Sequence, residues 1–162
     1  MVLIGPSGAG KSTFAARHFS RTEVVSSDFC RALVSDDQNN MTVTPAAFRI
    51  LHAIARERLR AGRLALIDAT NVKASSRKRL IAMARKFGRP AVAIAFDLPL
   101  ELCLEWNAGR ANRTVPADVV RLHHQQMTDS MAQIDAEGFA HGFILRSVAE
   151  IDEAVVTRSS PT

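Results

Sequence analysis

Short apolar runs alternate with amphipathic stretches along this chain. The runs are continuously apolar, and they predict strands over residues 1–4, 23–27, 64–67, 91–96 and 139–145. Between them, apolar residues recur at helical spacing and predict helices over residues 11–19, 29–34, 44–62, 75–87 and 99–109, a long one ending near 136, and 148–156. Apolar strands separated by helices are typical of a parallel sheet that helices cover on both faces. The pattern therefore predicts an α/β fold, in a single domain over residues 1–162.

The turn after the first predicted strand reads GPSGAGKST and fits the phosphate-binding pattern G-x-x-x-x-G-K-[S/T]. Its glycines let the backbone turn tightly with N–H groups aimed inward, which forms an anion nest at a helix N-terminus. We expect Lys11 to reach the β- and γ-phosphates of a nucleotide, and the Ser12 hydroxyl to ligate Mg²⁺. The predicted ATP-binding residues are Gly5, Ser7, Gly8, Ala9, Gly10, Lys11, Ser12 and Thr13.

Two carboxylates follow the second and third predicted strands, at the sheet edge where ligands gather in such folds. Asp28 is a candidate base for the proton of an acceptor hydroxyl, and it also stands where a helix N-cap belongs. Arg31 lies one helical turn further on and could bind a phosphate of the acceptor. We expect Asp68 to hold the metal ion or its waters, the alternative being a turn former at a strand end.

Arg110 and Arg113 lie in a short basic connection between two predicted helices. Such a segment is typical of a helical lid that closes on the phosphate donor, and the alternative is a basic surface loop. The adjacent His123 and His124 point to different faces of the long helix and lack ligand spacing, so neither is assigned a role. Trp106 is interpreted as a packing residue.

Composition narrows the class of protein. Hydrophobic residues make up 47% of the chain, and no apolar run approaches the roughly 20 residues that span a bilayer. The chain opens on a strand and its loop, and Cys30 and Cys103 lack metal-ligand spacing. We therefore expect a cytoplasmic protein with two reduced thiols, no leader segment and no membrane association.

Four stretches carry a resemblance to a known family. GPSGAGKSTFAARHF, SSDFCRALVSDD, LIDATNV and NAGRANR resemble the 5′-hydroxyl kinase domain of bacterial polynucleotide kinase-phosphatases, which are RNA-repair enzymes. The phosphate-loop pattern alone is shared by many unrelated ATPases, whereas SSDFCR is more specific. The resemblance runs along nearly the whole chain, and it implies transfer of the γ-phosphate of ATP to the 5′-OH end of RNA or DNA.

The same resemblance implies roles for individual residues. Asp28 would be the general base, Arg31 would contact the acceptor end, and either Arg110 or Arg113 would be the lid arginine. In that family the kinase is the first module of a longer chain that carries phosphatase and ligase-like domains. Nothing in this sequence matches those domains.

The net charge of +5 is concentrated in the middle of the chain. Residues 49–89 carry twelve basic side chains and two acidic ones, and arginine outnumbers lysine by 17 to 4 over the whole sequence. Such a patch suits a polyanionic partner, although a solvated helix face would give the same count. If the partner is a nucleic acid strand, the helix around Arg77, Lys78 and Arg79 is our candidate track for it.

Two other functions stay open. A small-molecule kinase would use Asp28 and Arg31 in the same way, but it would not need an extended basic surface. A nucleotide-dependent switch ATPase usually carries a Glu or Gln near the second carboxylate, whereas Asp68 is followed by Ala69-Thr70-Asn71. We therefore predict a 5′-hydroxyl polynucleotide kinase.

Overall fold

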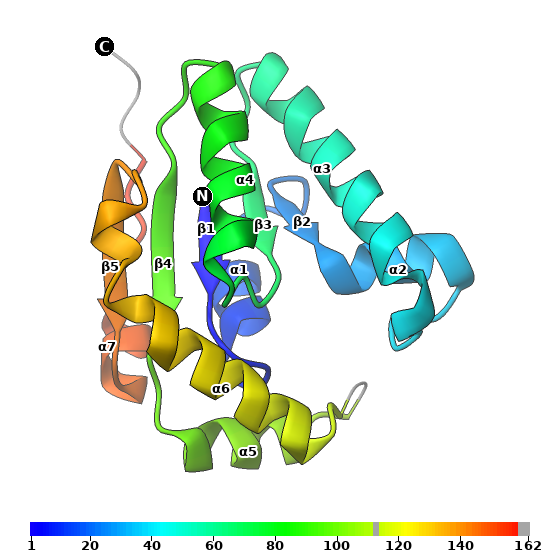
Figure 1. Cartoon of the computed structure of the whole chain (residues 1–162), viewed down its shortest axis with the longest axis vertical. Coiled ribbons are helices and arrows are strands. Elements are labelled where there is room, and N and C mark those ends of the chain that lie inside the picture. The colour runs from blue at the N-terminus through cyan, green and yellow to red at the C-terminus, as the bar shows by residue number, and fades with distance from the viewer. Residues whose placement is uncertain (112–113, 159–162) are drawn as a thin grey trace.

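A computed structural model describes residues 1–111 and 114–158 of the chain and contains one five-stranded sheet (Figure 1). All neighbouring strands are parallel, and they lie in the order β2-β3-β1-β4-β5. The strands are β1 (Val2–Ile4), β2 (Val24–Ser26), β3 (Leu66–Asp68), β4 (Val92–Phe96) and β5 (His141–Leu145). Strand β1 lies in the middle of the sheet. The chain adds β2 and β3 on one side of it and then β4 and β5 on the other. In open α/β sheets the crevice for a ligand lies at such a point, beyond the carboxyl ends of the strands.

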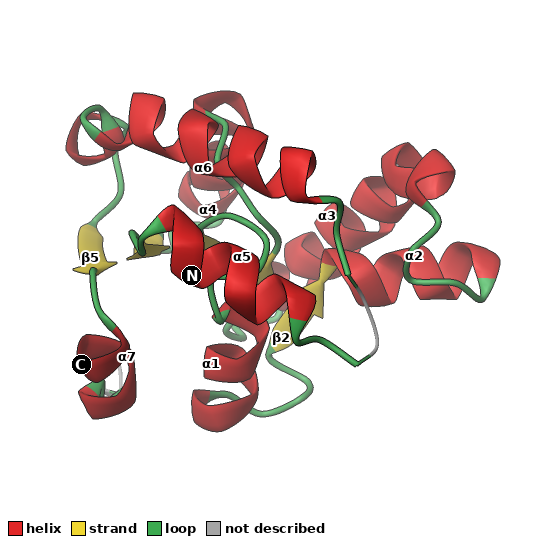
Figure 2. Cartoon of the chain, turned by 90° about the horizontal axis from the view of Figure 1, so that it is seen from below, coloured by secondary structure: helices red, strands yellow, loops and turns green. Residues whose placement is uncertain are grey.

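Helices cover both faces of the sheet. They are α1 (Lys11–His18), α2 (Ser27–Ser35), α3 (Thr44–Arg60), α4 (Ala74–Lys86), α5 (Leu100–Ala108), α6 (Ala117–Met131) and α7 (Val148–Glu153), with short 3₁₀ turns η1 (Met41–Val43) and η2 (Ile134–Ala136). Figure 2 shows α4 and α1 on opposite sides of the strands. Among the described residues, no helix is both long and apolar enough to cross a membrane.

The two faces of the sheet bury separate hydrophobic clusters. Alternate residues of a strand point to opposite faces, so Val2 and Ile4 of β1 join one cluster while Leu3 joins the other. Helices α3 and α4 pack on the first cluster, and α1, α5 and α7 pack on the second. Helix α6 contributes Met127 to the first cluster and Val120 to the second. The continuous apolar runs of β1, β3 and β4 are therefore strands buried on both faces, whereas the edge strand β5 is exposed over residues 141–143. The predicted fold is confirmed.

The start of α2 differs from the expectation. Its N-cap is Ser26, which has extended backbone and accepts a hydrogen bond at Oγ from the Phe29 amide at 3.3 Å. Asp28 lies inside the first turn, so its interpretation as the cap is wrong. The reason is that the hydroxyl of Ser26 already serves the amide donor three residues on, which is where an N-capping side chain acts. The carboxylate of Asp28 is thereby left for other contacts.

The predicted basic face of α4 also needs correction. Arg77 is completely buried, whereas Lys78 and Arg79 are exposed. The Arg77 guanidinium donates to the carboxylate of Glu137 and to the backbone carbonyl of Val72, at 2.9 Å from Nη1. A strand passing over the surface of α4 cannot contact this side chain, so Arg77 is removed from the candidate track.

Candidate active site

The phosphate-binding loop is pressed against α5. Gly8 and Gly10 both have left-handed backbone, with φ of 84° and 82°. A Cβ at Gly8 would lie 2.1 Å from the carbonyl oxygen of Cys103, and one at Gly10 would lie 3.1 Å from the ring of Trp106. A side chain at either position would therefore displace the loop from α5 or strain its backbone. Trp106 packs against this loop, as its interpretation as a packing residue predicts.

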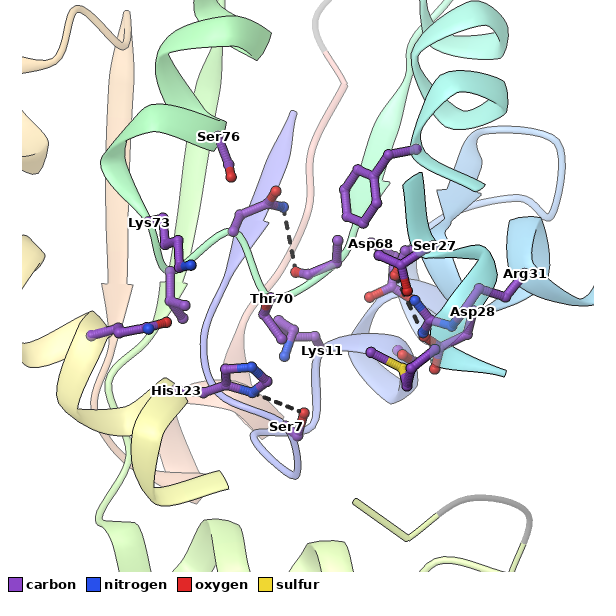
Figure 3. A pocket seen from close by; sticks show the side chains of 18 of the residues that line it. Ser7, Lys11, Ser27, Asp28, Arg31, Asp68, Thr70, Lys73, Ser76 and His123 are labelled. Carbon is purple, nitrogen blue, oxygen red and sulfur yellow. Dashed lines mark hydrogen bonds and ion pairs between the residues drawn. The ribbon is translucent and has the colours of Figure 1, made fainter. Parts of the chain in front are cut away.

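A pocket with a volume of about 260 Å³ opens beside this loop, at the carboxyl ends of β1, β2 and β3 (Figure 3). Seven of the thirteen predicted nucleotide-binding, catalytic and metal residues line it, and Gly5, Gly8, Ala9, Gly10 and Thr13 do not. The seven are Ser7, Lys11, Ser12, Asp28, Arg31, Asp68 and Arg110. Arg113 lies outside the described residues. Segments that are far apart in the sequence therefore meet at one site, because the parallel strands end at one edge of the sheet.

Lys11 is buried at the start of α1. Its ammonium nitrogen donates to the carbonyl oxygens of Gly5 at 2.8 Å and Pro6 at 2.6 Å. Burial lowers the pKa of Lys11 to about 8, an effect that the charge of Arg110 adds to and that of Asp68 opposes. The loop therefore holds a lysine whose proton is unusually weakly bound.

Asp68 ends β3 and is buried beside Ser12. Burial raises the pKa of the Asp68 carboxyl, while the charge of Lys11 and a hydrogen bond from the Ser12 hydroxyl lower it. Within the described residues, no group of three or more His, Cys, Asp or Glu side chains is placed to hold a metal ion. A carboxylate and a hydroxyl suit Mg²⁺, which keeps waters and takes substrate phosphates as its other ligands. The pair Ser12 and Asp68 therefore fits the predicted ion.

Asp28 and Arg31 form an ion pair on the first turns of α2, between Asp28 Oδ1 and Arg31 Nη2. The Arg31 side chain is almost wholly buried, and its Nε donates to the carbonyl of Gln38 at 2.8 Å. The Asp28 side chain keeps 31% of its surface exposed and lines the pocket. Arg31 thus ties the loop after α2 to the carboxylate, and Asp28 is the member of the pair that is more open to a ligand.

The loop between β3 and α4 is bound to the phosphate-binding loop. Asn71, with φ of 48°, donates from Nδ2 to the carbonyl of Leu3 at 2.8 Å. The amide of Gly5 donates to the carbonyl of Thr70 at 2.9 Å. These contacts join the floor of the pocket to the end of β1, so the two loops hold a fixed position relative to one another.

The connection between α5 and α6 is closed at its base by one side chain. Asn107 donates from Nδ2 to the carbonyl of Val115 at 2.7 Å, and its Oδ1 accepts from the amide of Val115 at 3.1 Å. Arg110 belongs to the loop that this contact closes, and it lines the pocket. The predicted lid thus starts from a firmly anchored base.

His123 is a pocket residue that the sequence reasoning left unassigned. Its Nδ1 lies 3.3 Å from the Ser7 hydroxyl, so α6 touches the phosphate-binding loop. A signal was present in the helical spacing, since His123 lies between the buried Val120 and Met127 on one face of α6. His124 faces elsewhere, and its Nε2 lies 3.0 Å from the carbonyl of Leu98.

A parallel sheet with a phosphate-binding loop after its first strand defines a P-loop kinase-like domain, and this fold implies nucleotide binding. Residues 1–134 match the family model described as "AAA domain", and the chain belongs to that family. No curated protein matches the chain.

Among the solved structures that are similar to the chain are two from kinase-related or RNA-repair proteins. One is a chain from the structure of the Pnkp1/Rnl/Hen1 RNA repair complex, with 25% identity and a TM-score of 0.69 over 83% of this chain. The present chain spans only 45% of that chain. The other is a gluconokinase from Sinorhizobium meliloti 1021, with 17% identity and a TM-score of 0.56, covering 94% of this chain and 84% of that one. The first similarity confirms the resemblance to a bacterial RNA-repair kinase domain, and the second confirms the kinase fold.

Proposed function

We propose that this domain is a 5′-hydroxyl polynucleotide kinase, which transfers the γ-phosphate of ATP to the 5′-OH end of RNA or DNA during nucleic-acid repair. The observation that carries the proposal is the convergence of two groups on one pocket. The phosphate-binding loop with Lys11 lies on one side of the pocket, and the partly exposed Asp28 of α2 lies on another. A phosphotransferase needs both a donor site and a base for the acceptor.

The donor site uses the amides of the phosphate-binding loop together with Lys11. In this proposal the Lys11 ammonium leaves the carbonyls of Gly5 and Pro6 and donates to phosphate oxygens instead. Ser12 and Asp68 hold Mg²⁺ or its waters. When bound, Mg²⁺ would neutralise charge on the phosphates. Arg110, and Arg113 from the lid, would stabilise the charge on the transferred group.

The acceptor side depends on Asp28. As the 5′ oxygen forms its bond to the γ-phosphorus, the bond from that phosphorus to the β–γ bridging oxygen breaks and ADP leaves. The proton of the 5′-hydroxyl passes to the Asp28 carboxylate. Arg31, which lines the pocket, orients this carboxylate through their ion pair and would contact the phosphate nearest the acceptor end.

Partners and location follow from the same proposal. The chain spans less than half of the RNA-repair chain that it resembles, so we propose that phosphatase and ligase-like domains act together with it. A cytoplasmic location, with no membrane partner, stays a prediction.

A small-molecule kinase is the second candidate, because a pocket of about 260 Å³ would also suit a compact acceptor.

The deciding experiment is a transfer assay with γ-labelled ATP and Mg²⁺. Acceptors would be a 5′-OH oligonucleotide, the same strand with a 5′-phosphate, and a panel of sugars and nucleosides. We expect label on the 5′-OH strand alone, and the Lys11→Ala variant should lose about 10²-fold in rate or more. Labelling of a sugar or nucleoside but not of the strand would overturn the proposal in favour of a small-molecule kinase. Phosphate release without any labelled acceptor would indicate an ATPase.

A further inference from the structure

A second hollow, with a volume of about 240 Å³, adjoins the active-site pocket between α3 and α4. Phe48, Asn71 and Ser76 line both hollows, so the two adjoin one another, and we refer to them together as the groove. Ile67 of β3, His52 of α3 and Arg79 of α4 also line the second hollow. Figure 1 shows that α3 and α4 splay apart toward the carboxyl edge of the sheet, where the first pocket opens.

Positive charge from both helices gathers around this second hollow. Burial lowers the pKa of His52, and the charges of Arg79 on α4 and Arg56 on α3 lower it further. Arg79 lines the second hollow, and Arg56 follows His52 by one turn of α3, so each helix places one arginine beside the imidazole. In the part of the chain that the structure describes, neither Arg56 nor Arg79 has a carboxylate partner, and both are exposed. Arg79 on the wall of the hollow, with Arg56 one helical turn from His52, gives unneutralised positive charge that suits an anion bound there.

Aromatic surface lies next to these charges. The rings of Phe48 and His52 are 6.0 Å apart between centroids, and both side chains are only partly buried. Aromatic faces beside arginines are the combination that binds single-stranded nucleic acid, with bases against the rings and phosphates against the guanidiniums. A small acceptor confined to the first pocket would reach Phe48 but neither His52 nor Arg79.

We propose that the acceptor strand leaves the active site along the groove between α3 and α4. A phosphodiester downstream of the terminal nucleotide lies between Arg79 and Arg56, and a base packs against Phe48 and His52. This inference rests on the proposed kinase function and names the path of its substrate. The groove replaces the track through Arg77 and Lys78, because Arg77 is buried.

The test compares two acceptors that share a terminal nucleotide. One is a single-stranded 5′-OH oligonucleotide, and the other is a nucleoside 3′-phosphate, which ends before the second hollow. The variant is Arg56→Glu with Arg79→Glu. Its matched control is Arg63→Glu with Lys86→Glu, which changes the net charge equally at exposed sites that neither line the hollows nor lie within one helical turn of His52. For each protein, the kcat/KM of the oligonucleotide is divided by that of the nucleoside 3′-phosphate.

We expect this ratio to fall about tenfold or more in the groove variant and to change little in the control. The slope of log(kcat/KM) against log[salt] for the oligonucleotide should become shallower by about one for each lost phosphate contact. If the ratio falls equally in both variants, or falls in neither, the proposed path of the acceptor strand is wrong. The proposed kinase function is not affected by that result.

Fluorescence anisotropy of a labelled 5′-OH strand separates the two hypotheses. If the wild-type protein binds the strand without phosphorylating it, the proposed function fails, and the groove is still judged by the binding of the two variants. Weaker binding by the groove variant alone would support the path. Equal binding by the groove variant and the control, or no binding by the wild type, would refute it.

Discussion

The guanidinium of Arg77 and the carboxylate of Glu137 form a two-pronged ion pair inside the protein. Nε lies 2.7 Å from Oε2 and Nη2 lies 2.5 Å from Oε1, with side chains that are 0% and 4% exposed. Through Nη1 the same guanidinium donates to the carbonyls of Asn71 and Val72. A buried charge is tolerated when its donors are satisfied, and all three guanidinium nitrogens have acceptors here. The ion pair thus fixes the position of the loop that contains Asn71, a residue that lines the active-site pocket.

We expect Arg77→Met to lower the free energy of unfolding by about 3–5 kcal/mol, because it leaves a buried carboxylate without a partner. The double variant Arg77→Met with Glu137→Leu should lose less than the sum of the single variants, since no charge is then stranded. Urea denaturation measures all three proteins. Lys78→Met, at the exposed neighbour, is the control and should change stability by no more than about 0.5 kcal/mol. A loss below about 1 kcal/mol for Arg77→Met would contradict this role.

Much of the fold could be predicted because its signals are local. Strand β4 reads as an unbroken apolar run, and such a run is expected of a strand that helices cover on both faces. The phosphate-binding loop carries its own glycine pattern. The meeting of Asp28 and Asp68 with that loop also follows from local signals, because each residue lies at the carboxyl end of a parallel strand or just after it.

The remaining features depend on contacts between residues far apart in the chain. The periodicity of α4 places Arg77 on the polar face of the helix. Arg77 is buried because it pairs with Glu137, which lies 60 residues away and is not part of that local pattern. His123 meets Ser7 across 116 residues, and only the packing of α6 over the phosphate-binding loop brings them together. Ser26 and Asp28 are both good capping residues by type, and only the backbone at the end of β2 decides between them.

The assignment of the cap makes a sharp test of Asp28 possible. Asp28→Asn keeps an oxygen that can accept from Arg31 but cannot take a proton at neutral pH, so transfer should fall by about 10²-fold or more. The affinity for ATP should change little, and the free energy of unfolding should fall only in part, because the buried Arg31 loses a charged partner but keeps an oxygen acceptor. Ser26→Ala should do the reverse, losing about 1 kcal/mol of stability with the cap while the folded protein keeps its turnover. Near-normal turnover in Asp28→Asn would remove the general base from the mechanism.

Arg110 is expected to be the more important of the two predicted lid arginines. It lines the pocket, and its charge acts on Lys11. Arg110→Ala should lower kcat by about 10²-fold, because a cation is lost where charge develops in the transition state. Arg113→Ala is the companion variant and should have the milder effect. Steady-state kinetics at saturating ATP distinguishes the two, and equal wild-type kcat values would exclude a lid arginine at either position.

The anchor of the lid gives an independent prediction. Asn107→Leu removes both hydrogen bonds to Val115 and leaves a buried amide and carbonyl without partners. The lid should then open more readily, so amide hydrogen exchange should become faster around residues 109–111 and 114–116. Turnover should fall while the core strands keep their protection. Unchanged exchange around the lid would show that the anchor is not needed.

Proton uptake on nucleotide binding would report the state of Lys11. Burial lowers its pKa to about 8 in the free protein, from an ordinary value near 10.5. Phosphate oxygens beside the ammonium favour its charged form, so the pKa should rise when ATP binds. The bound protein therefore holds more protons than the free protein above about pH 8, and linkage requires the affinity for ATP to fall as pH rises through that value. Well below pH 8, Lys11 is charged in both states and contributes no pH dependence.

Calorimetry near pH 8 can measure this uptake, by comparing binding enthalpies in two buffers with different heats of ionisation. We expect a fraction of a proton to be taken up for each ATP bound, increasing as the pH is raised above 8. The phosphates of ATP are already fully ionised there, so the proton comes to the protein. Lys11→Met, titrated at higher concentration because it binds more weakly, should take up none. Equal uptake by this variant would assign the proton to another group, and no uptake by the wild type would mean that Lys11 keeps its charge in the free loop.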